Sequence, residues 1–199
     1  MGFFRRNAGD ADRWVVVGLG NPGERYAGTR HNAGAMVVER LADQLGVKLK
    51  VHKSGALVAE GLLAGERVAL ARPTSFMNES GRNVRALMDF YKTPIERFIL
   101  VQDEIDIPFG EVRLKQGGGT AGHNGLRSVA NHLSSKDFLR VRVGVGRPRG
   151  SGDAADHVLQ RFSGAERADL PDLIERAADA VERVLEAGPT RAMNEFNTR

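Results

Sequence analysis

The sequence predicts an α/β fold, a single domain in which a mixed, twisted β-sheet is flanked by helices. Short continuous apolar runs alternate along the chain with segments whose apolar residues recur at helical spacing, a pattern typical of a sheet buried between helices. No internal repeat and no linker divides the 199 residues, and a chain of this length is long enough to bury one sizeable core.

The first half is expected to contain a buried strand, a helix and an antiparallel meander. Residues 14–19 are apolar on both sides of Gly18, which fits a strand buried on both faces. The helical pattern that follows ends at Gly46. Short glycine turns separate the next three strand-like segments, so we expect neighbouring segments to pair antiparallel. These elements span residues 14–19, 32–45, 47–52, 56–63 and 67–72.

The second half continues the alternation. Residues 81–91 predict a helix and residues 98–102 a second buried strand. A glycine-rich loop at 117–125 leads into a helix that ends near Leu133, and alternation at 139–145 predicts a further strand.

The C-terminal helix has the clearest pattern. Apolar residues recur at helical spacing from 170 to 185, and Gly188 ends the helix. Pro171 fits its first turn, and Ser163 with Glu166 predicts a capping box for a short turn just before it.

Composition excludes several classes of protein and site. The chain has no Cys, which excludes disulfides, a thiol nucleophile and iron–sulfur centres and fits a cytoplasmic protein. No apolar run approaches the roughly 18 residues of a membrane helix, so no membrane partner is expected. The start of the chain lacks the apolar region of a signal peptide. Residues 1–12 are predicted to be a disordered leader, and residues 13–199 the domain.

Charge is distributed unevenly. The formal net charge is only +4, but residues 1–163 carry 24 Lys and Arg against 17 Asp and Glu, while residues 164–199 carry 5 against 8. The positive excess therefore lies in the part of the chain that contains the polar motifs, and it suggests an anionic partner.

Residues 18–23 match the spacing G-x-G-x-x-G after a strand, which is the fingerprint of a dinucleotide site. In such sites a helix opens inside the motif and its amides meet the pyrophosphate. Here Pro22 and residues 24–28 precede any helical pattern. We favour the alternative that the glycines turn the chain away from the strand and present Asn21 in a crevice. A nucleotide-dependent enzyme would instead show a thermal shift with NAD or ATP.

Three predicted strands are each followed by a polar residue at the same edge of the sheet. These residues are Asn21, Asn78 and Asp103, and sites in open α/β sheets lie beyond the carboxyl ends of the strands. His31 starts the nearby helix, and imidazole is the side chain best suited to accept a proton near neutral pH. The alternative is structural: Asn78 caps a helix, Asp103 caps a turn, and His31 is an ordinary surface or core residue.

A His–Asp pair in this chain would most simply activate water. A carboxylate bonded to an imidazole fixes the imidazole tautomer and keeps the ring basic. There is no G-x-S-x-G nucleophile motif, no H-E-x-x-H, and no metal-ligand spacing among the five His. We therefore expect neither a metal nor a cofactor.

The glycine-rich loop lies among basic residues. Backbone amides in such a loop can approach a phosphate, and Arg residues on one face of the following strand favour phosphate contact. The alternative is a mobile solvent loop beside a solvated charged face. The basic residues around the loop are Lys115, Arg140, Arg142, Arg147 and Arg149.

Five motifs in the same order make the sequence resemble the bacterial peptidyl-tRNA hydrolase family. They comprise residues 17–26 with 30–32, 76–81, 103–108, 117–126 and 140–146. The resemblance implies a monomeric α/β domain that hydrolyses the ester between a peptide and the 3′ ribose of tRNA. This reaction recycles tRNA from peptides that the ribosome releases prematurely, so the expected partner is peptidyl-tRNA and not DNA.

The resemblance also implies roles for single residues. The residue matching His31 activates water, the one matching Asp103 keeps it basic and oriented, and the one matching Asn21 discriminates peptidyl-tRNA from free aminoacyl-tRNA. Residues matching Lys115 and Arg142 hold a tRNA phosphate. The substrate site is lined by the residues matching Tyr26, Phe76, Met77, Asn78 and Asn124.

The sequence departs from the family pattern at one place. The family commonly has His at the position of Thr120 and Gly at that of Ala121, and alanine restricts the backbone if a positive φ is required there. A hypothesis of another class is a non-catalytic RNA-binding protein on the same fold, as in the related plant chloroplast intron-splicing factors. Because His31, Asp103 and Asn21 are all present, we favour the enzyme.

Overall fold

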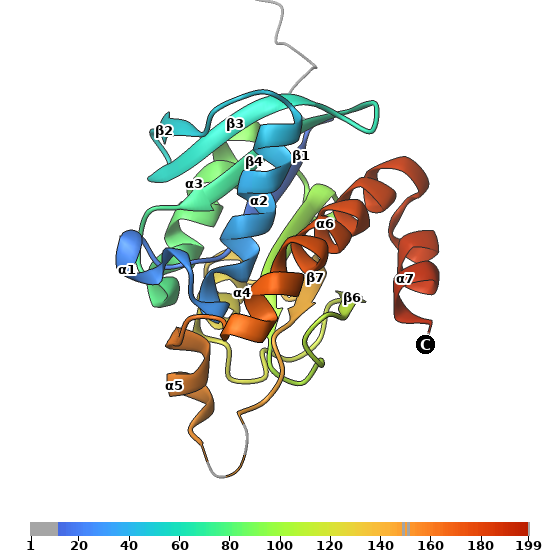
Figure 1. Ribbon diagram of the computed structural model, residues 1–199. Helices are drawn as coiled ribbons and strands as arrows, with labels where there is room; N and C mark the ends of the chain where they lie inside the picture. Colours follow the sequence, from blue (N-terminus) through green and yellow to red (C-terminus); the bar gives the residue numbers. More distant parts are fainter. Residues whose placement is uncertain (1–11, 149, 151, 199) are drawn as a thin grey trace, which may run out of the picture.

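The strands of the computed structural model form one mixed sheet (Figure 1). The structure describes residues 12–148, 150 and 152–198, and within them the sheet has seven strands in the order β2-β3-β4-β1-β5-β7-β6. The central strands β4, β1, β5 and β7 run parallel, whereas β2 and β3 extend one edge as an antiparallel meander and β6 pairs antiparallel with β7. The predicted mixed α/β fold is therefore confirmed. The strands are β1 (Trp14–Gly18), β2 (Lys50–His52), β3 (Ala56–Leu63), β4 (Glu66–Pro73), β5 (Phe98–Glu104), β6 (Val112–Gln116) and β7 (Leu139–Gly144).

Helices cover both faces of the sheet (Figure 1). One face packs against α2 (Ala33–Gln44), α6 (Gly164–Ala187) and α7 (Pro189–Asn197), and the other against α3 (Ser80–Tyr91) and α4 (Asn124–Leu133). Side chains of β1 alternate between the two cores, so the strand is apolar throughout, as predicted. The remaining helical segments are α1 (Glu24–Ala27), α5 (Ala154–Leu159), η1 (Arg30–Asn32), η2 (Met77–Glu79) and η3 (Ile95–Arg97).

The long C-terminal helix begins earlier than predicted. Ser163 and Glu166 do form a capping box, but it starts α6 itself rather than a separate turn. Pro171 therefore lies inside the helix and not in its first turn. A proline inside a helix costs a hydrogen bond, and the capped N-terminus and the buried apolar face of α6 outweigh this cost.

The longest of the elements that were not predicted are β6, α5 and α7. β6 is a five-residue edge strand, too short to stand out by alternation. The side chain of Asn197 at the end of α7 bonds both the N–H and the C=O of Leu114, each at 2.9 Å. α7 thereby satisfies backbone groups of an edge strand that would otherwise stay unpaired.

Some boundaries also differ from prediction. β5 extends to Glu104, so Asp103 lies within the strand rather than after it, and β2 is limited to Lys50–His52. Apart from Asp12, the predicted leader lies outside the described residues. Among the described residues, no helix combines the length and the apolarity needed to cross a membrane.

Candidate active site

A cleft of about 700 Å³ opens at the carboxyl ends of β1 and β5, the edge where sites form in open α/β sheets. The turn after β1, η1, η2, β5 and the N-terminus of α4 all contribute to its wall, and α5 adds Val158 and Leu159. Six of the predicted site residues line the cleft: Asn21, His31, Met77, Asn78, Asp103 and Asn124.

Gly18 at the end of β1 and Gly34 in α2 allow this helix to approach the sheet closely. A Cβ on Gly18 would overlap the carbonyl oxygen of Gly34, and a Cβ on Gly34 would overlap that of Val101. The motif 18–23 thus serves packing and a turn. Only the four-residue helix α1 follows it, so its geometry does not fit the dinucleotide site considered above.

Asn21 is held rigidly in this turn. Its backbone N–H donates to Asn32 Oδ1 and its C=O accepts from Asn32 Nδ2, both at 2.9 Å. Its side-chain Oδ1 accepts the N–H of Met77 at 2.8 Å. The amide orientation is therefore set, and Nδ2 is the donor that Asn21 offers to the cleft. Asn32 was not among the predicted site residues, and its contacts with Asn21 bridge a turn and the end of η1.

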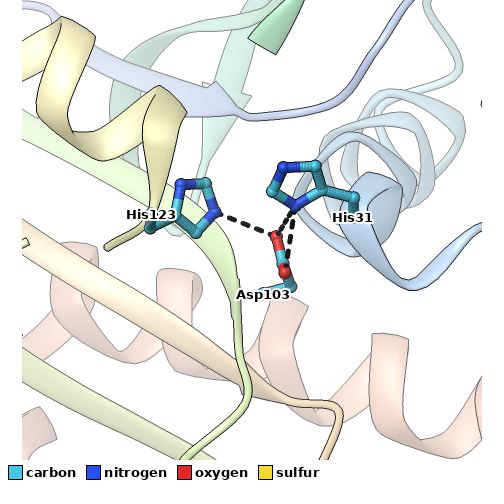
Figure 2. Close-up of side chains that lie close together, drawn as sticks. All are labelled: His31, Asp103 and His123. Atoms are coloured by element: carbon cyan, nitrogen blue, oxygen red, sulfur yellow. Dashed lines mark hydrogen bonds and ion pairs between the residues drawn. The ribbon is translucent and has the colours of Figure 1, made fainter. Parts of the chain in front are cut away.

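His31 lies in η1 and contacts Asp103 as predicted. Nδ1 of His31 is 2.9 Å from Oδ1 and 3.1 Å from Oδ2 of Asp103 (Figure 2). An ionised carboxylate only accepts hydrogen bonds, so Nδ1 carries the proton and Nε2 keeps its lone pair. This is the tautomer that a general base requires.

Arg30 fixes the turn that carries His31. This buried residue donates from its backbone N–H to the carbonyl of Gln160 at 3.1 Å and from Nη1 to the carbonyl of Arg161 at 3.0 Å. Its Nη2 pairs with Glu166 at 2.7 Å. The position of His31 therefore depends on the junction between α5 and α6, about 130 residues away along the chain.

His123 is a third member of the cluster that sequence analysis missed. Its Nε2 lies 3.0 Å from Oδ1 of Asp103, the oxygen that also bonds His31 (Figure 2). Its Nδ1 accepts the N–H of Leu126 at 3.2 Å, so His123 is also the N-cap of α4. The only signal for His123 in the sequence was its place between the glycine-rich loop and a predicted helix. Because the usual N-caps are Ser, Thr, Asp and Asn, a His at this place did not indicate a cap.

The charge of Asp103 is stabilised by this arrangement. Burial raises the pKa of Asp103, but the imidazoles of His123 and His31 lower it by more, so the pKa lies well below its usual value of 3.8. The carboxylate is therefore ionised at neutral pH and orients both rings.

The cluster has the dimensions of a cation site, since the ligand atoms of His31, Asp103 and His123 all lie within 4.8 Å of one another. Two imidazoles and a carboxylate are ligands that Zn²⁺ accepts. However, Leu126 donates to Nδ1 of His123, so the proton of the neutral ring sits on Nε2 and points to Asp103. A cation bound at Nε2 of His123 would need a lone pair on that nitrogen. The ring proton would then have to move to Nδ1, where it would break the cap of α4. Hydrogen bonds from the two ring N–H groups to the Asp103 carboxylate therefore fit these residues better than a metal.

Tyr26 and Phe76 lie outside the cleft lining. Their rings form an edge-to-face pair with centroids 6.4 Å apart, and Phe76 is 53% exposed. Because Asn21 bonds the residue next to Phe76, the pair lies at the rim of the cleft, where it can contact a bound chain.

Lys115 and Arg142 also lie outside the cleft, in a ladder of four cations on one face of β6 and β7. Lys115 pairs with Arg140 and Arg113 with Arg142 across the two strands. Like charges directly opposite one another destabilise a sheet. Burial and the neighbouring Arg142 lower the pKa of Arg140. Within the described part of the chain, Nε and Nη2 of Arg140 and Nε of Arg142 have no hydrogen-bond partner.

The glycine-rich loop lies directly against this cation ladder. Nη1 of Arg140 donates to the carbonyl of Gly119 at 2.9 Å, and a Cβ on Gly118 would lie 2.8 Å from Cε of Lys115. Ala121 adopts a φ of 46°. The positive φ considered from the sequence is therefore required here, and alanine adopts it at a cost of roughly 1 kcal/mol.

The chain is similar in sequence and in structure to proteins named peptidyl-tRNA hydrolase. A family model described as peptidyl-tRNA hydrolase matches residues 15–199. The chain is 57% identical over 184 residues to the peptidyl-tRNA hydrolase of Frankia casuarinae, covering 92% of this chain and 93% of that protein. It is 54% identical over 185 residues to that of Mycobacterium avium, covering 92% and 97%. The crystal structure of peptidyl-tRNA hydrolase from Acinetobacter baumannii is similar with a TM-score of 0.87 and 38% identity, covering 94% and 96% of the two chains.

Proposed function

The chain belongs to the peptidyl-tRNA hydrolase family, and from this premise we propose that it hydrolyses the ester of peptidyl-tRNA with a water molecule that His31 activates. The observation that carries the mechanism is the pair formed by His31 and Asp103. Because Nδ1 donates to the carboxylate, Nε2 presents a lone pair to the cleft. The family establishes an enzyme that acts on this class of ester; the roles of single residues are our proposal.

The reaction needs one proton acceptor that later returns the proton. Nε2 of His31 takes a proton from water while the water oxygen attacks the ester carbonyl carbon. The tetrahedral intermediate then expels the ribose 3′ oxygen, which takes the proton from the imidazolium. The products are a peptide with a free carboxyl group and a tRNA with a free 3′ hydroxyl. Asp103 stabilises the imidazolium between these steps, and the side-chain amides of Asn78 and Asn124 are candidate donors for the oxyanion.

Asn21 provides a basis for selecting blocked substrates. Its free Nδ2 is a donor, because Met77 occupies Oδ1. The carbonyl that precedes the last residue of a peptide can accept this hydrogen bond. A free aminoacyl group has only an ammonium at that place, which would set donor against donor and leave the amide mispaired.

The cation ladder provides a place for a phosphate of tRNA. Among the described residues, Lys115, Arg140 and Arg142 form no ion pair within 4.0 Å, although Glu104 lies near enough to both arginines to oppose the lowering of their pKa values by burial. Buried donor atoms of both arginines have no hydrogen-bond partner in this part of the chain. A phosphodiester would satisfy these donors and relieve the repulsion between them. We propose that the domain at 13–199 acts as a cytoplasmic monomer on peptidyl-tRNA.

Removal of the positive charge at Lys115 or Arg142 should weaken tRNA binding in a salt-dependent way. We expect Lys115→Ala and Arg142→Ala to lower affinity and each to reduce the slope of log K against log[salt] by about 1. Filter binding of N-acetyl-aminoacyl-tRNA, with each variant combined with His31→Ala to prevent hydrolysis, measures both effects between 50 and 200 mM salt, about the range over which phosphate contacts show. Lys48→Ala, an exposed lysine between α2 and β2, is the matched control. Unchanged slopes in both variants would contradict this role.

The function itself is tested by comparing N-acetyl-aminoacyl-tRNA with free aminoacyl-tRNA, with and without a chelator. We expect rapid release of the acetylated amino acid, slow release of the free one, and no effect of the chelator. Binding without hydrolysis would indicate the RNA-binding alternative. Loss of activity with the chelator would indicate a metal at the His–Asp–His cluster.

A further inference from the structure

We propose that His123 is a positioning residue that couples the N-terminus of α4 to the basicity of His31 through the shared carboxylate of Asp103. The inference rests on the proposed function, because it takes His31 as the base, and it identifies what regulates that base. It is carried by the two hydrogen bonds of the His123 ring, one at each nitrogen.

The two nitrogens of His123 have opposite roles. Nδ1 accepts the N–H of Leu126 and must keep its lone pair. Nε2 therefore carries the proton of the neutral ring and donates it to Asp103 at 3.0 Å. A second proton on Nδ1 would set two N–H groups against each other at a helix N-terminus, where the helix dipole also disfavours positive charge. The geometry holds His123 as a neutral donor.

This donor competes with His31 for one carboxylate. Oδ1 of Asp103 receives both rings, and the side chain of Asp103 is only 2% exposed. Each hydrogen bond to a carboxylate disperses its negative charge. Donation from His123 therefore reduces the stabilisation that Asp103 gives to an imidazolium at His31. With His123 in place, the carboxylate is held between two rings and shares its charge with both of them.

The coupling reaches the loop that lies on the cation ladder. The N–H of His123 donates to the carbonyl of Thr120 at 2.9 Å, and Asn124 follows directly in the cleft wall. A shift of the glycine-rich loop would therefore move the His123 ring relative to Asp103. Contact of the glycine-rich loop with tRNA would therefore affect the basicity of His31 through the side chain of His123.

The other charged groups around the cluster have partners of their own. Arg30 pairs with Glu166, Arg127 donates to Asn124, Asp153 caps α5 through the N–H of Ala155, and Glu104 accepts the N–H of Asp106. Among the described residues of η1, β5, α4 and α5 that line or support the cleft, the charged groups are Arg30, Glu104, Arg127 and Asp153. None of them bonds the Asp103 carboxylate.

Two variants separate the two hydrogen bonds of His123. Asparagine is a preferred N-cap, so His123→Asn retains an acceptor for Leu126 but is too short to reach Asp103. His123→Ala removes both bonds. We expect His123→Asn to move the acid limb of the kcat/KM profile to higher pH, because Asp103 then stabilises the imidazolium of His31 more strongly. We also expect kcat to fall roughly tenfold with little change in KM, because the carboxylate loses one of the two rings that fix its orientation. His123→Ala should show the same pH shift and also raise KM, because Asn124 loses its fixed position. Circular dichroism checks that both variants fold.

An NMR measurement tests the tautomer without reference to activity. Imidazole ¹⁵N shifts in the full chain should show His123 protonated at Nε2 and unprotonated at Nδ1 between about pH 5 and 8, where an ordinary imidazole changes its charge. A proton on Nδ1 of His123 in that range would overturn the proposal, as would an unchanged acid limb in His123→Asn. Activity that survives in His31→Ala would instead overturn the proposed function, so the two failures are distinguishable.

Discussion

Replacing His31 with alanine is expected to lower kcat for N-acetyl-aminoacyl-tRNA by about 10³-fold, within the range of 10²–10⁴ typical of a lost general base. The loss should fall on catalysis and not on structure, because Arg30 anchors the turn η1 to the α5–α6 junction. Asp103 also keeps its hydrogen bond to His123, so the variant does not leave a buried carboxylate unpaired. Affinity for the substrate should stay within a few-fold of the wild type.

Single-turnover kinetics and tRNA binding of His31→Ala measure these two effects separately. The matched control is His132→Ala, which removes an exposed imidazole on α4 that does not line the cleft. The control should retain full activity. A kcat of His31→Ala within threefold of the wild type would exclude His31 as the base.

Replacing Asp103 with asparagine should reduce kcat by a comparable factor, about 10³ to 10⁴. An amide oxygen in place of Oδ1 could still accept from both rings, but the NH₂ group in place of Oδ2 would then lie 3.1 Å from Nδ1 of His31 and set donor against donor. One ring must then change its tautomer. Because Leu126 holds the tautomer of His123, His31 is the ring expected to change, which places its proton on Nε2 and removes the base from the cleft.

This substitution should also alter the pH dependence of stability. The folded protein holds the pKa of Asp103 below its usual 3.8, so the ionised carboxylate contributes stability above pH 3.8. That contribution is lost as the pH falls through the lowered folded pKa. At pH 7, Asp103→Asn should lower the free energy of unfolding by about 2 kcal/mol, and the difference should shrink below pH 3.8.

Urea unfolding at pH 7 and pH 3 measures the change in stability, and steady-state kinetics measures the change in kcat. Asp106→Asn is the matched control, because Asp106 lies on the same segment and pairs at the surface with Arg147. The control should change neither quantity appreciably. Full activity of Asp103→Asn would show that His31 does not depend on the carboxylate.

The sequence by itself determined the features that depend on neighbours along the chain. The alternation of apolar residues predicted the buried strands and the helices α2, α3, α4 and most of α6, since strand and helix periodicities are local. The motifs identified the family, and the polar residues at strand ends predicted Asn21, Asn78 and Asp103 at one edge of the sheet. Short elements such as β6 and α5 escaped prediction because a few residues carry too little pattern.

Tertiary structure alone decided how the polar groups are oriented and shared. Asp103 lies 72 residues from His31 and 20 from His123 in the chain, and no local pattern indicates that one carboxylate oxygen accepts from both. The direction of the Asn21 amide depends on the N–H of Met77, 56 residues away. The cation ladder exists because the register of β6 against β7 places Lys115 opposite Arg140. Such contacts are set by packing between distant segments, whereas periodicity and capping are set by residues within a few positions of one another.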